Sequence, residues 1–395
     1  MKVLLSAFHC SPGYGSEFGN GWQWAKSLAD CGHDVTVLTL SQFVETLKET
    51  GRSDINFEYI DLPGTPLGFL PVVPVFHQYR RWQTAAFQRA TELRATYDVV
   101  HHVTWGSLHL GSRLWQLPAP LVYGPIGGGQ VAPRNYWRYF GRNWPVEAMR
   151  TTLTGRPLLL NEWSRQTVRH SAVTLVTNSA TESACRRLGA TDIRYFLAEG
   201  LPPEWLSGPR QRPTGVPVIL WVGRLLPRKA PTLAVEAFAE LLKHTPARLA
   251  IVGDGPLREK VRNTVESLGL ASHVDLLGHV PWAEIPHLYD SATVFLFCSL
   301  RDSSGAQFLE SLGRGLPAVT IDHHGMSDLN VGLAAEKVAL PSHPDELPRR
   351  IATALQTVIS GDDWEKRSAA GTEWAANHTW PEKAAAATKI YNQVA

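Results

Sequence analysis

The sequence lacks long hydrophobic runs and clustered cysteines. Although 44% of the 395 residues are hydrophobic, no apolar run reaches the roughly 18 residues that a membrane-spanning helix needs. The chain has only four cysteines, and they form no CxxC or zinc-finger spacing: Cys10, Cys31, Cys185 and Cys298. Such scattered cysteines are typical of a reducing compartment. We therefore expect packing thiols rather than disulfides, and no metal site.

The sequence also lacks a strong charge of one sign. Its 38 Lys and Arg are almost balanced by 36 Asp and Glu, for a formal net charge of +2. A nucleic-acid-binding protein concentrates basic residues on one face, so we expect no nucleic-acid partner. The first residues, Met1–Phe8, form a short strand-like run without the length of a secretory signal core. The protein is therefore expected to be cytoplasmic.

A dinucleotide-binding fingerprint is missing as well. The Gly-rich loop after the first apolar run, Gly13–Gly19, has the wrong spacing for G-x-G-x-x-G. A nicotinamide-dependent dehydrogenase would need that glycine set, so the sequence does not fit this class of enzyme. Adjacent histidines at His323 and His324 do not make a metal site either, because neighbouring side chains point apart and no carboxylate spacing supports them.

Alternation of strand-like and helix-like segments is what the sequence does contain. Strands are predicted at 2–7, 34–39, 98–104, 120–123, 172–177, 216–222, 248–252, 274–276, 293–300 and 317–321, and helices at 19–31, 82–95, 180–188, 231–244, 257–268, 285–290 and 306–314. Strands this apolar, alternating with helices, indicate parallel sheets covered on both faces. We expect an α/β fold of two doubly wound Rossmann-like domains, because the chain exceeds the size of a single core.

Pro and Gly interrupt all periodicity between Gly200 and Gly215, which predicts the linker between the domains. The boundaries are placed at 1–205 and 206–375, followed by a last segment at 376–395. Open α/β sheets bind ligands at the carboxyl ends of their strands. The active site is accordingly expected where the two domains face each other across a cleft.

Two segments of the second half point to the chemistry. Val222–Lys229 offers two cations, Arg224 and Lys229, just beyond a buried strand, and Arg301–Glu310 offers a small-residue loop that opens a helix and is flanked by carboxylates. Cations and helix-start N–H groups suit a diphosphate, while carboxylates suit the hydroxyl groups of ribose and sugar. Together they predict a nucleotide-diphosphate-sugar site, although an isolated Arg and Lys pair is more often an ordinary surface turn.

With these motifs the chain resembles the retaining glycosyltransferases of family 4, which have the GT-B architecture. The resemblance extends over most of the chain and rests on Pro12–Glu17, Gly223–Lys229, Val252–Pro256, Gly315–Pro317 and Thr379-Trp380. It implies an acceptor-binding domain at 1–205, a nucleotide-sugar-binding domain at 206–375, and a final helix at 376–395 that crosses back to the first domain.

The resemblance also implies roles for single residues. Arg224 and Lys229 would bind the diphosphate and stabilise the leaving group, Glu310 would hold the ribose and Asp302 would contact the donor sugar. Asp302 is one methylene shorter than the usual Glu. Ser303 and Ser304 replace a more usual Gly-aromatic pair, and Gly305 remains. The alternative is that Asp302 and Ser303 merely cap the following helix.

Further donor contacts are expected from glycine turns. Gly15 and Ser16 can bring N–H groups close to a phosphate or acceptor. Gly255 is a further expected donor contact, and main-chain groups near Gly278–Val280 are expected to hold the base. In the family a histidine often lies near the sugar. Counted from Asp98, that position is Val103 in this sequence, and His102 is the nearest histidine. A structural histidine at a strand end is the equal alternative.

Residues 131–170 carry seven arginines against Glu147 and Glu162, interleaved with aromatic residues. Arginine with aromatics suits an acceptor-binding lid or a peripheral contact with the anionic inner face of a membrane. An ordinary surface helix with inward-packed Trp residues is the third possibility.

These features predict a retaining glycosyltransferase that moves a sugar from a nucleotide-diphosphate donor to a hydroxyl acceptor: a saccharide, a lipid-linked glycan or a small natural product. The nucleotide sugar is a co-substrate, and no cofactor or divalent ion is expected. A nucleotide-sugar epimerase and a non-catalytic nucleotide-sugar-binding protein are the alternatives.

Overall fold

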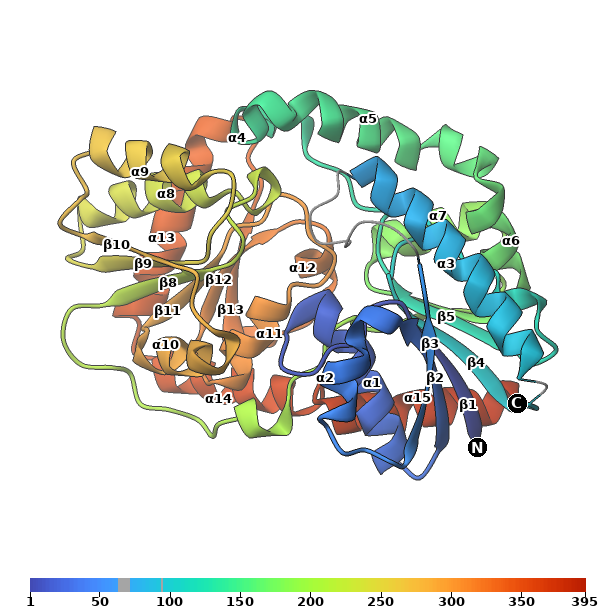
Figure 1. The fold of residues 1–395 in the computed structure, drawn as a ribbon. Helices are drawn as coiled ribbons and strands as arrows, with labels where there is room; N and C mark the ends of the chain where they lie inside the picture. The colour runs from blue at the N-terminus through green and yellow to red at the C-terminus, as the bar shows by residue number, and fades with distance from the viewer. Residues whose placement is uncertain (63–71, 94) are drawn as a thin grey trace. The chain divides into compact units, whose positions relative to one another are not determined.

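The computed structural model describes residues 1–62, 72–93 and 95–395, and the chain forms two compact units (Figure 1). Unit 1 contains Met1–Gly129, Leu153–Gly200 and Trp380–Ala395. Unit 2 contains Gln130–Thr152 and Leu201–Thr379. Each unit has its own parallel sheet, which confirms the predicted α/β class and the two doubly wound domains.

Unit 1 is built on seven parallel strands in the order β3-β2-β1-β4-β5-β6-β7. Their bounds are β1 Lys2–Ala7, β2 Asp34–Leu40, β3 Ile55–Ile60, β4 Val99–Thr104, β5 Leu121–Ile126, β6 Ser171–Val176 and β7 Ile193–Tyr195. Every residue of β4 and β5 is buried, because helices cover both faces of a parallel sheet. This burial fits the absence of Asp, Glu, Lys and Arg from both strands, although β4 carries His101 and His102.

The helices of unit 1 come from distant parts of the chain. They are α1 Ser16–Asp30, α2 Val44–Lys48, α3 Val72–Glu92, α6 Glu162–His170, α7 Ser179–Leu188 and α15 Trp380–Val394. The C-terminal helix α15 packs against α1. Its Tyr391 hydroxyl lies 2.5 Å from Nδ1 of His101 in β4, and its Lys383 donates to the Leu197 carbonyl. The last helix is therefore an integral part of unit 1.

Unit 2 is built on six parallel strands in the order β10-β9-β8-β11-β12-β13. The strands are β8 Val218–Val222, β9 Arg248–Val252, β10 Val274–Gly278, β11 Val294–Phe297, β12 Ala318–Asp322 and β13 Ala335–Ala339. The helices are α4 Trp137–Phe140, α8 Pro231–Leu242, α9 Arg258–Ser267, α10 Ile285–Ser291, α11 Ala306–Gly313, α12 Gly325–Asp328, α13 Leu347–Ser360 and α14 Trp364–Ala376. Helix α5, Trp144–Thr154, is divided between the units, and its residues as far as Thr152 belong to unit 2.

Glycine turns join the carboxyl ends of neighbouring strands in unit 2. The Gly223 N–H donates to the Val252 carbonyl (2.9 Å), and the Gly253 N–H donates to the Gly278 carbonyl (2.7 Å). Gly253 has φ +126°, and a Cβ there would lie 2.0 Å from the Gly223 oxygen. Only glycine fits this conformation and this close approach. The turns after β8, β9 and β10 are thereby fixed to one another.

The structure differs from the sequence prediction at several elements. Helix α3 begins at Val72, ten residues before the predicted start at Trp82, and strand β3 was not predicted. The middle residues of β3 are partly or fully exposed, so this edge strand carries mixed polar and apolar residues rather than an apolar run. Residues 130–152, assigned to the first domain from sequence, group with unit 2.

We predict that Gly253→Ala strongly destabilises unit 2. The new Cβ would meet backbone at 2.0 Å in a positive-φ conformation, which should lower the free energy of unfolding by roughly 3 kcal/mol or more. The control is Gly269→Ala, where φ is +70° but a Cβ would meet nothing within 4 Å. Denaturant unfolding should show a loss of only about 1 kcal/mol for the control. Equal losses in the two variants would contradict this account.

Candidate functional site

The candidate site lies at the carboxyl edge of the unit 2 sheet, at its topological switch point. From β8 the chain continues to β9 and β10 on one side, and β11 then returns to the other side of β8. Loops that follow strands on either side of such a point diverge and leave a crevice for ligands. Here these are the loop 223–230 after β8 and the loop 298–305 after β11.

Lys229 and Asp302 join these two loops. The Lys229 Nζ lies 2.5 Å from the Asp302 carboxylate, and Arg228 Nη1 lies 3.3 Å from the same oxygen. The side chains of Lys229 and Asp302 are 10% and 14% exposed. Burial alone would raise the pKa of Asp302, but the two cations outweigh it and hold this pKa below its ordinary value. The carboxylate is therefore ionised and fixed in place.

The loop after β11 is fixed in detail by its neighbours. The Ser303 N–H and the Ser299 hydroxyl donate to Asp302, at 3.0 and 3.2 Å. Gly305 has φ +75°, and a Cβ there would lie 2.7 Å from the ring of Phe297. Gly305, not Asp302, is the N-cap residue of α11, and no side-chain hydrogen bond caps this described helix. Asp302 is thus engaged with cations and not with helix capping.

Arg224 lines an open pocket of about 550 Å³ at the ends of β8, β9 and β10. The predicted residues Gly255 and Val280 line the same pocket, together with Val222, Gly223, Val252, Gly253, Asp254, His279 and Ile285. Arg224 is exposed. In the described part of the chain, its guanidinium takes part in no hydrogen bond or ion pair, so the charge is available to a ligand.

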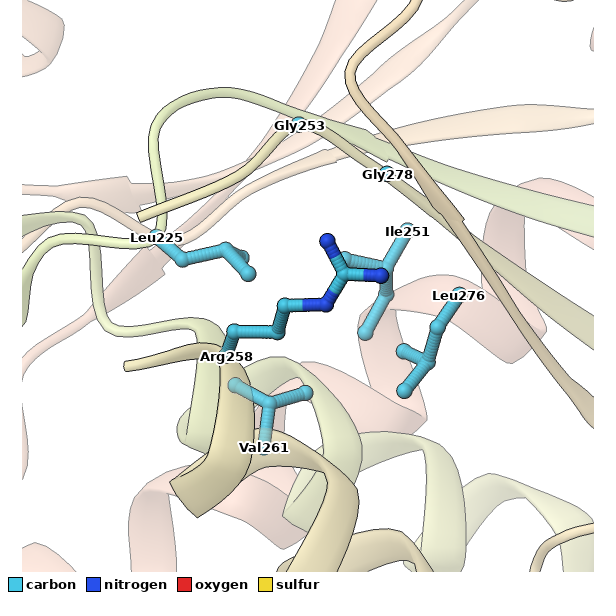
Figure 2. A pocket seen from close by; sticks show the side chains of 7 residues that line it. All are labelled: Leu225, Ile251, Gly253, Arg258, Val261, Leu276 and Gly278. Carbon is cyan, nitrogen blue, oxygen red and sulfur yellow. The ribbon is translucent and has the colours of Figure 1, made fainter. Parts of the chain in front are cut away.

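A second hollow beneath the glycine turns is too small for a ligand (Figure 2). Its volume is about 10 Å³, around the minimum for one water molecule. Figure 2 shows the Arg258 guanidinium among Leu225, Ile251 and Leu276, below Gly253 and Gly278. Arg258 also pairs with Asp254 at 2.9 Å. This arginine supports the turns from below, and the open pocket at Arg224 is the larger of the two spaces at these turns.

Glu310 is held by a buried tyrosine. It lies on α11, where its Oε2 accepts a hydrogen bond of 2.9 Å from the Tyr289 hydroxyl. The same hydroxyl lies 3.3 Å from the Gln307 carbonyl, and the Gln307 side chain lies 3.4 Å from Lys229 Nζ. Burial and the Glu310 charge raise the pKa of Tyr289 well above its ordinary value. Glu310 is therefore oriented within the same group of side chains that holds Lys229.

The predicted residues of unit 1 lie at the start of α1 and in β4. Gly15 precedes α1 as its N-cap residue, and Ser16 begins the helix, with a side chain outside what the structure describes. His102 is fully buried. Its Nδ1 lies 3.0 Å from the Ser6 hydroxyl and its Nε2 lies 3.2 Å from the Tyr79 hydroxyl. Burial lowers the pKa of His102 to about 4. These contacts fit the alternative that His102 is a structural histidine at the end of a strand.

The sequence reasoning missed the ion pair that connects α5 to the loop after β11. Glu147 accepts from Arg301 through both carboxylate oxygens, at 2.8 and 3.0 Å. The Arg301 and Glu147 side chains are only 8% and 13% exposed. Tyr136 also donates to the Pro341 carbonyl at 2.8 Å. The sequence contains one indication of this pair, a Glu within an arginine-rich stretch. Sequence spacing could not show that its partner is Arg301, because the two residues lie far apart in the chain.

Unit 1 has a carboxylate at its own switch point, between β1 and β4. Glu17, in the first turn of α1, accepts from the Gly106 N–H at 3.3 Å. Burial and the neighbouring Glu199 raise its pKa to about 7, against the lowering effect of that hydrogen bond. A carboxyl that titrates near neutral pH at this edge is suited to exchange protons with a bound hydroxyl group.

Among the described residues, no cluster of three or more His, Cys, Asp and Glu side chains is arranged to hold a metal ion. The rings of His323 and His324 lie 3.7 Å apart. None of the helices in the described ranges combines the length and the hydropathy of a membrane span.

Comparison with known proteins covers both halves of the chain. Residues 207–371 match the family described as Glycosyl transferases group 1, and residues 22–198 match the Glycosyl transferase 4-like domain. The D-inositol 3-phosphate glycosyltransferase of Corynebacterium diphtheriae is 27% identical, in an alignment that covers 100% of this chain and 95% of that protein.

Solved structures share the fold. Sucrose-phosphate synthase of Thermosynechococcus elongatus has a TM-score of 0.72 at 17% identity, covering 99% of this chain and 98% of its own. The Anabaena protein HepE, solved in complex with UDP, has a TM-score of 0.65 at 16% identity and full coverage of both chains. With the two parallel sheets, this likeness confirms the GT-B architecture expected from the sequence.

We predict that Glu17→Gln removes a pH dependence of stability. Because the folded pKa of Glu17, about 7, exceeds the ordinary 4.5, the unfolded chain releases this proton first and stability falls as pH rises from 4.5 to 7. Above pH 7 the variant should therefore be more stable than the wild type by roughly 1–3 kcal/mol. Urea unfolding between pH 4.5 and 8 measures the difference. Glu49→Gln, at an exposed position of the same unit, should leave the wild-type pH profile unchanged.

Proposed function

The chain belongs to the group 1 glycosyl transferases and is a retaining, nucleotide-sugar-dependent enzyme, and on this basis we propose that Arg224 and Lys229 bind the donor diphosphate. One observation carries the proposal. At the switch point of the unit 2 sheet, the cationic loop after β8 meets the acid-flanked loop after β11, where Lys229 contacts Asp302. The charge type and the place in the fold both suit a nucleotide diphosphate.

The donor would be held by four groups of contacts. Arg224 and Lys229 meet the diphosphate, and Ser303, Ser304 and Gly305 offer backbone N–H groups at the start of α11. Glu310, oriented by Tyr289, accepts from the ribose hydroxyls. Asp302 contacts the donor sugar, and the open pocket at Gly255 and Val280 receives the base. Gly15 and Ser16 of unit 1 remain predicted phosphate or acceptor contacts.

The reaction needs charge stabilisation more than an enzyme nucleophile. The acceptor hydroxyl oxygen bonds to the anomeric carbon on the face that the diphosphate leaves, and the carbon–oxygen bond to the phosphate breaks. The departing phosphate oxygen takes the hydroxyl proton, so configuration is retained. Negative charge grows on the diphosphate during this step, and Arg224 and Lys229 are placed to stabilise it. These cations would do the electrostatic work of a divalent ion.

The hydroxyl acceptor is assigned to unit 1. Its switch-point edge carries the Gly15 turn and the half-buried Glu17 carboxyl, which are groups that can bind hydroxyls. A saccharide, a lipid-linked glycan and a small natural product are the acceptor classes in question.

We predict that Lys229→Ala reduces kcat by about 100- to 1,000-fold, the usual effect of removing one group that stabilises a leaving-group charge. Turnover is measured with UDP-, GDP-, ADP- and TDP-sugars and a panel of acceptors. Lys260→Ala, on the exposed face of α9, is the control and should keep wild-type turnover.

Thermal unfolding of both variants separates catalysis from folding. A folded Lys229→Ala enzyme with unchanged kcat would refute the assignment. Epimerised donor without any transferred sugar would identify the wild type as an epimerase. Donor binding without any turnover would identify a binding protein.

An anionic membrane surface is a second proposed partner, supported by the exposed residues of α4 and α5. Trp137, Val146 and Met149 are each 58% exposed. Arg134 and Arg142 are exposed close to them in the sequence. Exposed apolar residues flanked by basic residues are the pattern of a helix that lies in a membrane interface.

We expect the double variant Val146→Asp, Met149→Asp to lose binding to vesicles that contain phosphatidylglycerol, because each change removes buried apolar area and adds like charge. Co-sedimentation at low and high salt measures the binding. Val216→Asp is the control, because Val216 is equally exposed outside this segment. If the wild type fails to sediment with the vesicles, or if the double variant binds equally well, the membrane role is wrong.

A further inference from the structure

We propose that Glu147 is a positioning residue of the donor site. Through Arg301 it holds the loop after β11, and with it Asp302, in place against the loop after β8. The proposal deepens the donor-site assignment and rests on it. None of the donor motifs in the sequence includes Glu147, which lies 154 residues before Arg301. Only the fold brings the two residues together.

The segment 130–152 contacts both loops of the site. Its helix α4 packs against the turn Pro227–Lys229 in the loop after β8. Its helix α5 carries Glu147, which pairs with Arg301 in the loop after β11. One short segment from the first half of the chain therefore reaches the loops on both sides of the switch point.

The pair of Glu147 and Arg301 fixes orientation as well as position. The Arg301 Nε and Nη2 atoms donate to different carboxylate oxygens of Glu147, at 2.8 and 3.0 Å. A bidentate pair of this kind holds the plane of the guanidinium group. Both side chains are nearly excluded from water. Separating them would leave a buried charge without its partner, which is strongly unfavourable.

The main chain at Arg301 is held from the loop after β8. The Leu300 N–H donates to the Arg228 carbonyl at 2.8 Å. The Arg228 Nη1 atom lies 3.5 Å from the Arg301 carbonyl and 3.3 Å from the Asp302 carboxylate. Arg301 is thus fixed by its side chain from α5 and by its main chain from the loop after β8. Because Asp302 is the next residue in the chain, its carboxylate is kept within reach of Lys229.

Sugar transfer at this site would be sensitive to the position of the loop. In the proposed donor site, Lys229 stabilises the leaving diphosphate and Asp302 contacts the sugar. A misplacement of about 1 Å, caused by a change far from the reacting atoms, can lower a rate by about 100-fold. Glu147 would act through Arg301, so it is a positioning residue and not a catalytic one.

The first experiment measures turnover of UDP-, GDP-, ADP- and TDP-sugars by full-length chains. Glu147→Gln keeps the shape of the side chain but removes its charge, and we expect kcat to fall by about 10- to 100-fold. Tyr136→Phe is the matched control, because it removes a buried hydrogen bond of the same segment, to the Pro341 carbonyl after β13. This control should lose stability and keep the wild-type kcat. Equal losses of kcat in the two variants, or an unchanged kcat in a folded Glu147→Gln variant, would overturn the proposal.

A double-mutant cycle tests whether Glu147 acts through Asp302. If it does, Glu147→Gln should add little to the loss of kcat that Asp302→Asn causes, because the effects of residues that act as a unit are not additive. Losses that multiply would show that the two residues act independently, against the proposal.

Hydrogen exchange tests the loop without reference to the reaction. Amide exchange in the peptide 299–305 should be faster in Glu147→Gln than in the wild type and in Tyr136→Phe, because the loop has lost its anchor. Unchanged exchange in this peptide would overturn the positioning role. A wild type that turns over no nucleotide sugar would refute the proposed function, and the exchange rates would still decide whether Glu147 holds the loop.

A second variant covers the case in which thermal unfolding shows that Glu147→Gln does not fold. Glu147→Asp keeps the charge, but its side chain is one methylene shorter and cannot keep both hydrogen bonds unless the loop shifts. We expect a smaller fall in kcat and a smaller rise in the exchange rate than for loss of the charge. Wild-type values of both would again overturn the role.

Discussion

The contact between Lys229 and Asp302 is the interaction on which the candidate site depends. It joins the loops that follow β8 and β11, the two strands on either side of the switch point. A buried carboxylate is tolerated only when it is paired and hydrogen-bonded. Asp302 meets this requirement with Lys229, Arg228, Ser299 and the Ser303 N–H. An incoming anion would compete with Asp302 for Lys229, so anion binding at the loop after β8 would be coupled to the position of this carboxylate.

The segment 130–152 adds a second constraint on the same loops. Its Glu147–Arg301 pair is nearly excluded from water, where removing one partner costs far more than at the surface. Tyr136 and Arg138 tie the same segment to Pro341, Glu236 and Asp345. The loop after β11 is thus braced by residues from the first half of the chain. This explains how an arginine-rich stretch serves the second unit without forming a separate domain.

The two units use the same edge of their sheets in different ways. In unit 2, charged side chains gather at the switch point and pair with one another across two loops. In unit 1, the switch point carries the carboxyl of Glu17, whose burial favours the protonated form, and the neutral His102 lies deeper in the core. A cationic edge suits a diphosphate, and an edge with a neutral or weakly acidic carboxyl suits an uncharged hydroxyl compound.

The sequence by itself determined the fold class, the two domains, the family and most central strands, because apolar runs and glycine turns are local signals. It also predicted Arg224, Lys229, Asp302 and Glu310 as donor contacts from the motifs in which they lie. Only the tertiary structure decided that His102 is enclosed by Ser6 and Tyr79, that edge strand β3 exists, and that Glu147 pairs with Arg301 in the loop after β11. These facts depend on contacts between residues far apart in sequence, and no local pattern records which distant side chain a charge will meet.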